Sequence, residues 1–279
     1  MLPHAGPATL RRELRTSLVL AFPLILGHVC TGLIGFVDAV LAGQHGANTL
    51  AAVAVGSALW SVVIIVLIGV LLALPPTVSQ LDGAGRRDEI APALRQGVWL
   101  ALLLAALLFG FLSASGWLLP AFGIAPEIQP GARDFLFGIR WGVPAIALYF
   151  CMRYLSEGLH WTWPTLAFGV GGLALLIPLG YALMFGRFGL PAMAAAGLGY
   201  ATAIMLWLQA FGFAIYLARS RRFSDLGLFS RFEPPRWGAI RDLLRLGLPI
   251  GVSIFMEGSL FIVTALLMGR LGEVPAAAH

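Results

Sequence analysis

The sequence contains no lysine and little charge of either sign. Its 18 basic residues are all arginine, 13 residues are Asp or Glu, and charged residues make up only 11% of the 279. Soluble domains carry about a quarter charged residues, so this composition excludes a water-soluble globular domain. The hydrophobic content of 59% and the mean hydropathy of +0.89 indicate an integral membrane protein instead.

Metal-binding and disulfide patterns are also lacking. The two cysteines, Cys30 and Cys151, lie in apolar runs and form no CxxC motif, and the five histidines include no HxxxH pair. We therefore expect no cofactor, no metal site and no disulfide framework. The net charge of +5 does not indicate a nucleic-acid partner, because the arginines lie in short polar breaks between apolar runs. That distribution is typical of a protein whose partner is membrane lipid.

Seven apolar stretches are long enough to cross a bilayer as helices, which takes roughly 20 residues. The first stretch is too long for the apolar core of a signal peptide and lacks a convincing cleavage site, so we interpret it as a span. The predicted fold is an all-α, polytopic transmembrane helical bundle. The spans are expected at 17–42, 50–76, 96–119, 133–158, 164–185, 193–218 and 243–269.

The arginines predict the orientation of these spans. If the spans alternate in direction, most arginines fall on one side of the membrane, and the positive-inside rule makes that side, with the N-terminus, cytoplasmic. Only Arg133, Arg187 and Arg270 fall on the other side. The cytoplasmic set is Arg11, Arg12, Arg15, Arg86, Arg87, Arg95, Arg153, Arg219, Arg221, Arg222, Arg231, Arg236, Arg241 and Arg245.

The first and seventh spans resemble each other when they are superimposed at an offset of 226 residues. LAFPLIL then aligns with LGLPIGV, and AGQHG aligns with MGRLG, so that one proline and two glycines coincide. Parallel repeats of this kind build many transporters. A complete second copy would require about five more spans, so we expect the chain to be a fragment or a truncated product.

Asp38 is an acid within the first predicted span. On a helix it shares one face with Thr31 and Gly35. An ionisable group in a span is costly and usually faces a cavity or a partner. Because burial disfavours the charged form of a carboxyl group, such an acid can take up a proton near neutral pH. An acid beside hydroxyl groups also suits a hard cation such as sodium.

Glu257 is a second acid, near the middle of the seventh span, and it shares a helical face with Ser253 and Thr264. We expect Thr31, Ser253 and Thr264 to line a substrate cavity between the two acids.

Other residues within the predicted spans are expected to have structural roles. Arg153 and Glu157 are expected to form an i,i+4 ion pair at a helix end. Arg140 is expected against protein or at the outer interface.

Tryptophans, Trp60 among them, are expected mostly at membrane interfaces or in helix packing.

Five strings in order resemble the MATE family of multidrug and toxic compound extrusion transporters, and its NorM-like branch most closely. They are AFPLILGHVCTGLIGFVDAVLAG, PPTVSQLDGAGRRDEI, MRYLSEGLHWTWP, GRFGLPAMAAAGLGYATA and LRLGLPIGVSIFMEGSLF. The resemblance covers nearly all of residues 10–275. It implies a twelve-helix transporter with two six-helix lobes that exchanges protons or sodium ions for cationic amphipathic drugs by alternating access, in the bacterial inner membrane.

The resemblance also implies roles for individual residues. Asp38 matches the first-helix acid linked to cation coupling, Thr202 matches a sixth-helix residue near that site, and Glu257 matches the seventh-helix acid linked to cation binding in the second lobe. The expected domains are a cytoplasmic arm at 1–16, an N-terminal six-helix lobe at 17–218, an inter-lobe linker at 219–242, and the first helix of an incomplete C-terminal lobe at 243–279.

One departure from the family concerns the fifth helix. Relatives often carry Asn or Asp twice there, whereas this chain reads LIPLG from Leu176 to Gly180. Without these two polar side chains, we expect protonation of Asp38 in place of a well-coordinated sodium site. The same departure could equally reduce the coupling between ion and substrate transport. The missing helices, or a second polypeptide, would be needed for a full transporter.

Three alternatives remain open. A flippase for lipid-linked precursors would need cationic cavity residues for a phosphate headgroup, and few are present within the spans. An inactive half-transporter would follow from the missing helices. A membrane phosphotransferase is suggested faintly by Asp82-Gly83 before Arg86 and Arg87, but the later aspartates such chemistry needs are absent. We therefore expect a transporter and no enzyme activity.

Overall fold

All regular secondary structure in the described part of the chain is helical. The computed structural model describes the backbone of residues 7–187, 189, 191–228 and 230–270, and the side chains within these ranges except those of 7–20, 260–262 and 269. No strand occurs among these residues. This confirms the predicted all-α bundle, since only helices satisfy every backbone polar group within one segment.

The helices follow one another with short connections. The α-helices are α1 (Pro7–His45), α2 (Ala47–Leu71), α3 (Leu74–Gly83), α4 (Ile90–Ser113), α5 (Ser115–Ala121), α6 (Gln129–Ile139), α7 (Val143–Gly158), α8 (Trp163–Phe185), α9 (Ala194–Arg219) and α10 (Trp237–Arg270). Short 3₁₀ helices lie between them: η1 (Arg87–Glu89), η2 (Arg140–Gly142) and η3 (Ser224–Leu226).

Six segments of the described chain are long and apolar enough to cross a membrane, and each overlaps one of the first six predicted spans. They are Ala21–His45, Ala47–Gly83, Arg87–Ser113, Gln129–Gly158, Trp163–Phe185 and Ala194–Arg219. The seventh predicted span falls within α10, where several side chains lie outside the described residues. Helix α10 begins at Trp237, so the last residues of the predicted inter-lobe linker are already helical.

Proline explains why two of these segments consist of more than one helix. Pro75 stands in the first turn of α3, and Pro144 stands in the first turn of α7. A proline is tolerated in a first turn because its missing N–H would have no intrahelical partner there. The second segment therefore divides after Leu71, and the fourth divides into α6, η2 and α7.

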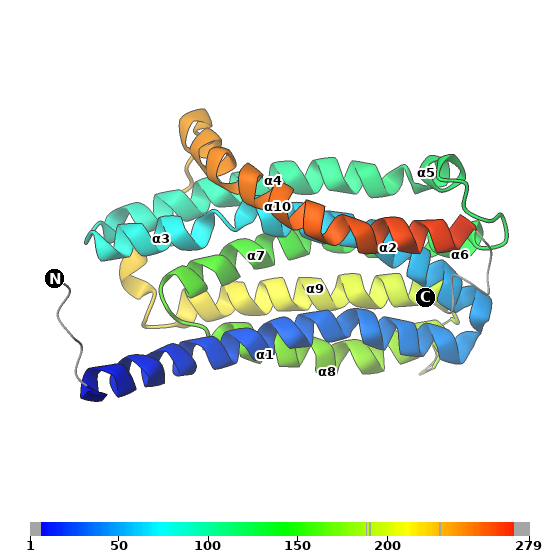
Figure 1. The fold of residues 1–279 in the computed structure, drawn as a ribbon, viewed down its shortest axis with the longest axis horizontal. Helices are drawn as coiled ribbons and strands as arrows, with labels where there is room; N and C mark the ends of the chain where they lie inside the picture. Colours follow the sequence, from blue (N-terminus) through cyan, green and yellow to red (C-terminus); the bar gives the residue numbers. More distant parts are fainter. Residues whose placement is uncertain (1–6, 188, 190, 229, 271–279) are drawn as a thin grey trace.

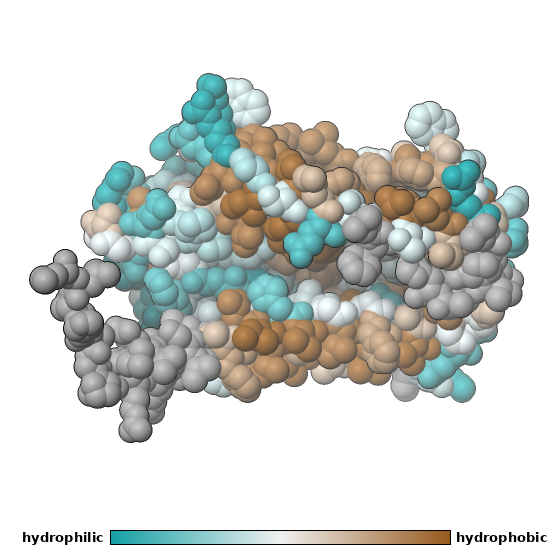
Figure 2. Space-filling view, viewed as in Figure 1, coloured by the Kyte–Doolittle hydropathy of each residue, from teal (hydrophilic) through white to brown (hydrophobic). Residues whose placement is uncertain are grey.

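The helices lie side by side along the long axis of the molecule. Figure 1 shows α1 next to α8, with α9 beside them and α10 crossing in front of α2. Glycines permit the α2–α10 crossing, because a Cβ atom on Gly69 would overlap Gly251 and one on Gly247 would overlap the Val70 carbonyl. Small residues at such crossings let membrane helices approach closely. Apolar side chains dominate the middle of the molecule, and hydrophilic ones gather toward the end that carries α3 (Figure 2).

The connection between α9 and α10 is fixed to α4 by a polar cluster. Arg95 pairs with Glu233 at 2.5 Å and also donates to the carbonyl oxygens of Gly227 and Leu228. Trp99 Nε1 donates to the Glu233 carbonyl oxygen at 2.8 Å. This connection is therefore attached to the six-helix unit up to the start of α10.

Candidate functional site

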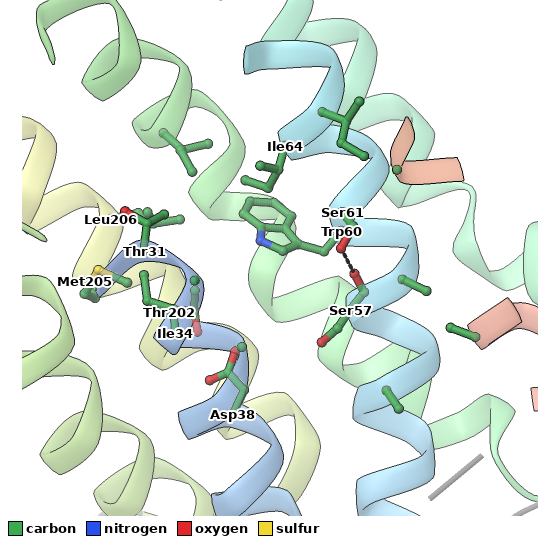
Figure 3. A pocket seen from close by; sticks show the side chains of 18 residues that line it. Thr31, Ile34, Asp38, Ser57, Trp60, Ser61, Ile64, Thr202, Met205 and Leu206 are labelled. Atoms are coloured by element: carbon green, nitrogen blue, oxygen red, sulfur yellow. Dashed lines mark hydrogen bonds between the residues drawn. The ribbon is translucent and has the colours of Figure 1, made fainter. Parts of the chain in front are cut away.

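A pocket lies between α1, α2 and α9, with a contribution from α7 and α10. Its volume is about 510 Å³, and its walls are mostly apolar. Figure 3 shows the side chains that enter it. The residues that line it are Thr31, Gly32, Ile34, Gly35, Asp38, Ala54, Ser57, Ala58, Trp60, Ser61, Ile64, Ile65, Ile146, Thr202, Met205, Leu206, Gly258 and Ala265.

Asp38 is the ionisable side chain in this lining. Its exposed fraction is 4%, and its buried Oδ1 atom has no hydrogen-bond partner in the described structure. Thr31, Gly35 and Asp38 all line the pocket from α1, which confirms that they share one helical face. A buried carboxyl oxygen without a partner is costly unless it is protonated or a cation approaches it, so this arrangement suits reversible binding of a positive charge.

Three hydroxyl groups share the pocket with the carboxylate, and their donors are already engaged. Thr31 Oγ1 donates to the Gly27 carbonyl at 2.9 Å, Thr202 Oγ1 donates to the Leu198 carbonyl at 3.1 Å, and Ser61 Oγ donates to the Ser57 carbonyl at 2.8 Å. Each hydroxyl oxygen retains acceptor capacity. The described residues contain no group of three or more His, Cys, Asp or Glu side chains that would hold a metal. A cation at this site would therefore rely on one carboxylate and neutral oxygens.

Thr202 is 2% exposed and lies on α9, far from Asp38 in the sequence. The structure brings the two residues to one pocket. Its position in the sequence was linked to the site only through the family resemblance.

Trp60, Ser57 and Ser61 were not predicted as site residues. They lie on α2, and Figure 3 shows the Trp60 indole reaching into the cavity from that helix toward α9. The general expectation that a tryptophan packs or lies at an interface did not identify this one. The sequence feature that could have identified these site residues is the i,i+4 spacing of Ser57 and Ser61 around Trp60 in an otherwise apolar run, because residues at that spacing share one helical face.

Glu257, Ser253 and Thr264 do not line this pocket. Glu257 and Ser253 are exposed on α10, and Thr264 is half-buried. Helix α10 contributes Gly258 and Ala265 to the pocket instead. Within the described residues, therefore, the predicted second acid is not brought together with Asp38.

The predicted ion pair of Arg153 and Glu157 is confirmed. Arg153 Nε donates to Glu157 Oε1 at 2.7 Å, with both side chains largely buried. Thr165 Oγ1 on α8 donates to the same oxygen at 2.9 Å, and Arg153 Nη2 lies against the His28 ring on α1. This cluster joins three helices and has a structural role.

The LIPLG positions lie at the level of the Asp38 carboxylate. Helices α1 and α8 run side by side: Gly169 faces Gly27 and Cys30, and Gly180 faces Leu41. Leu176 and Gly180 therefore lie on either side of the level of Asp38. Neither provides a side-chain oxygen.

The sequence profile of the MatE family matches residues 23–182, more than half of the chain. A protein of Xanthomonas campestris pv. campestris named probable multidrug resistance protein NorM is 59% identical over 281 residues, covering 100% of this chain and 61% of the relative. The chain thus spans about 60% of the length of this curated relative.

Two solved structures show the same fold. The eukaryotic MATE transporter AtDTX14 has a TM-score of 0.82 at 20% identity, covering 95% of this chain and 58% of that chain. The MATE transporter NorM-NG in complex with R6G and a monobody has a TM-score of 0.68 at 31% identity, covering 92% of this chain and 56% of that chain.

Proposed function

The chain belongs to the MATE family of transporters, and we propose that it forms the Asp38-containing part of an antiporter that exports cationic amphipathic compounds in exchange for protons or sodium ions. The similar proteins are named as multidrug resistance proteins and MATE transporters, not as enzymes. This leaves the membrane phosphotransferase without support.

The observation that supports this proposal is the unpartnered carboxylate of Asp38 in an otherwise largely apolar pocket. One carboxylate neutralises one positive charge, so a coupling ion and a cationic substrate exclude each other there. If the two ligands also prefer different conformations of the transporter, their competition couples the inward movement of one to the export of the other. The apolar walls accommodate the hydrophobic part of the substrate.

We favour the proton over sodium as the coupling ion. A sodium ion requires several oxygen ligands. The hydroxyls of Thr31 and Thr202 line the same pocket, but Leu176 and Gly180 supply no side-chain oxygen at the level of Asp38. Protonation requires only the carboxylate itself. Glu257 would serve a second site only after further residues cover its exposed face of α10.

We propose that the chain spans the bacterial inner membrane several times with its N-terminus in the cytoplasm. The arginines of the connections after α3 and α9 lie at one end of the bundle, and this end also carries the start of α10 (Figure 1). By the positive-inside rule that end faces the cytoplasm.

A lipid-linked precursor flippase fits the pocket less well. Its phosphate headgroup would need cationic side chains, and no arginine is among the described residues that line the pocket. Asp38 would repel the phosphate. The polarity of the pocket therefore favours a cationic substrate.

An efflux assay tests the proposal. Residues 1–270 would replace the matching segment of the Xanthomonas relative, so that the pocket functions within a complete transporter. We expect Asp38→Asn to abolish ion-driven export of a cationic dye while membrane insertion is unchanged. Asp242→Asn, which alters an exposed acid outside the pocket, is the matched control.

Full dye export by Asp38→Asn would refute the assignment of that residue. The chain would also be assayed alone, without the remaining part of the Xanthomonas relative. A lack of dye export by the chain alone would support the proposal that further helices or a second polypeptide are needed.

A further inference from the structure

Arg140 is held in an aromatic cluster away from the pocket. Its Cζ atom lies 3.8 Å from the centroid of the Phe137 ring, 5.2 Å from that of Phe109 and 5.6 Å from that of Trp141. The rings come from α4, α6 and η2. Cation–π contacts at these distances hold a guanidinium by its faces.

The edges of the guanidinium remain available. Arg140 Nη1 donates to Ser113 Oγ at 3.1 Å, and Ser113 Oγ donates in turn to the Phe109 carbonyl at 2.7 Å. Arg140 Nε is buried without a partner. An arginine has five N–H donors in one plane, so most donors of the two Nη atoms have no acceptor among the described residues. No acid there lies within ion-pair distance of Arg140.

The cluster lies on the surface of a membrane-spanning segment. Phe137 is 47% exposed and Trp141 is 49% exposed, as expected for side chains that face lipid. An isolated charge at this depth is costly and requires a partner or access to the headgroups.

The direction of the side chain brings the charge toward the headgroups. Side chains on a helix point back over the preceding turn, and the guanidinium does lie over Phe137, three residues earlier. That direction leads to the start of α6, at the end of the bundle that carries α5 (Figure 1). Arg133, which is exposed and donates to the Gly116 carbonyl there, is roughly 10 Å further along at 1.5 Å per residue.

We propose that Arg140 binds the phosphodiester group of a membrane phospholipid at this end of the bundle. The aromatic rings hold the guanidinium plane in place, and its Nη donors form a fork for two phosphate oxygens. Arginine is the residue best suited to this planar, bidentate contact. Phe137 and Trp141 would contact the upper part of the acyl chains. The site is separate from the Asp38 pocket and does not depend on export activity.

Native mass spectrometry of the purified chain tests the proposal, with phosphatidylglycerol, phosphatidylethanolamine and a phosphate-free galactolipid as probes. We expect the wild-type chain to retain either phospholipid with roughly tenfold higher affinity than Arg140→Gln, the loss expected for charge-assisted hydrogen bonds. The galactolipid should bind both chains equally. Inorganic phosphate should not displace the phospholipid.

Two variants sharpen the result. Arg133→Gln removes an exposed arginine at the same end and should retain phospholipid as the wild type does. Arg140→Lys keeps the charge but loses the planar fork, so it should bind phospholipid less tightly than the wild type. If Arg140→Gln fails to insert into the membrane, the comparison of Arg140→Lys with the wild type tests the proposal instead. Equal phospholipid retention by the wild type and these Arg140 variants would overturn the proposal. Displacement by inorganic phosphate would overturn the assignment to lipid.

Discussion

Asp38 on α1 and Thr202 on α9 line one pocket, and the Thr202 hydroxyl donates to the Leu198 carbonyl at 3.1 Å instead of to the Asp38 carboxylate. The threonine therefore offers the pocket an acceptor, as Asp38 does. Two acceptors that face one cavity repel an anion and favour a proton or a cation. This relationship is the physical basis of the antiport proposed here.

Trp60 is expected to determine preference for aromatic cations. Its indole lies in the pocket across from α9 (Figure 3), and an aromatic ring packed against an indole gains about 0.5–1.5 kcal/mol beyond the area buried. Trp60→Leu should weaken binding of ethidium about 2- to 13-fold and weaken binding of tetrabutylammonium, which has no ring to stack, less, as measured by equilibrium binding to the purified chain. Trp60→Phe keeps a ring, so its affinity for ethidium should lie between those of the wild type and Trp60→Leu. An equal loss for both cations would mean that Trp60 only shapes the cavity.

Arg95 is expected to hold the connection between α9 and α10. Removing it leaves Glu233 Oε1, on a mostly buried side chain, and two carbonyl oxygens without their donor, while Arg236 still pairs with Glu233 Oε2 at 3.3 Å. Arg95→Gln should lower the free energy of unfolding by about 2 kcal/mol. It should also speed trypsin cleavage after Arg231 and Arg236, which are exposed already, because the connection that carries them is then no longer held against α4. Limited proteolysis measures the second effect.

Arg86→Gln is the control for Arg95→Gln, because the Arg86–Glu89 pair is exposed and such pairs contribute about 0–1 kcal/mol. Identical cleavage patterns for the wild type and Arg95→Gln would contradict the attachment of this connection to α4.

Gly69 is expected to be required for the α2–α10 crossing. A Cβ atom there would overlap the backbone of Gly251, and overpacking of this kind costs about 1–3 kcal/mol. Gly69→Ala should therefore lower the unfolding temperature of the purified chain. Gly171→Ala places its new methyl group in open space and should not. Equal unfolding temperatures for both variants would show that α10 shifts without cost.

The sequence predicted those features that depend on local periodicity. Apolar length located the first six spans, helical spacing placed Thr31, Gly35 and Asp38 on one face, and the i,i+4 rule identified Arg153 with Glu157. These features need no knowledge of which helices are neighbours. Helix ends were less exact where proline divides a segment, as before α7.

Contacts between helices that are far apart in the sequence could not be predicted from local periodicity. Trp60 resembles an interfacial tryptophan until α9 is placed opposite it. Arg140 has Phe137 and Trp141 as sequence neighbours, but it gains Phe109 and Ser113 as partners only when the end of α4 meets η2. Glu257 was predicted to face the same chamber as Asp38, but the face of α10 that reaches the pocket carries Gly258 and Ala265. Such relationships depend on how helices rotate about their axes when they pack.

The most direct test of the account measures competition at Asp38. Ethidium would be titrated into the purified chain, and into the transporter completed with the Xanthomonas segment, by calorimetry in buffers of different ionisation enthalpy. If one carboxylate alternates between a proton and the substrate, ethidium binding releases a proton and weakens as the pH falls. Asp38→Asn should bind weakly and release none. Undiminished binding by Asp38→Asn, with the same proton release, would contradict the account.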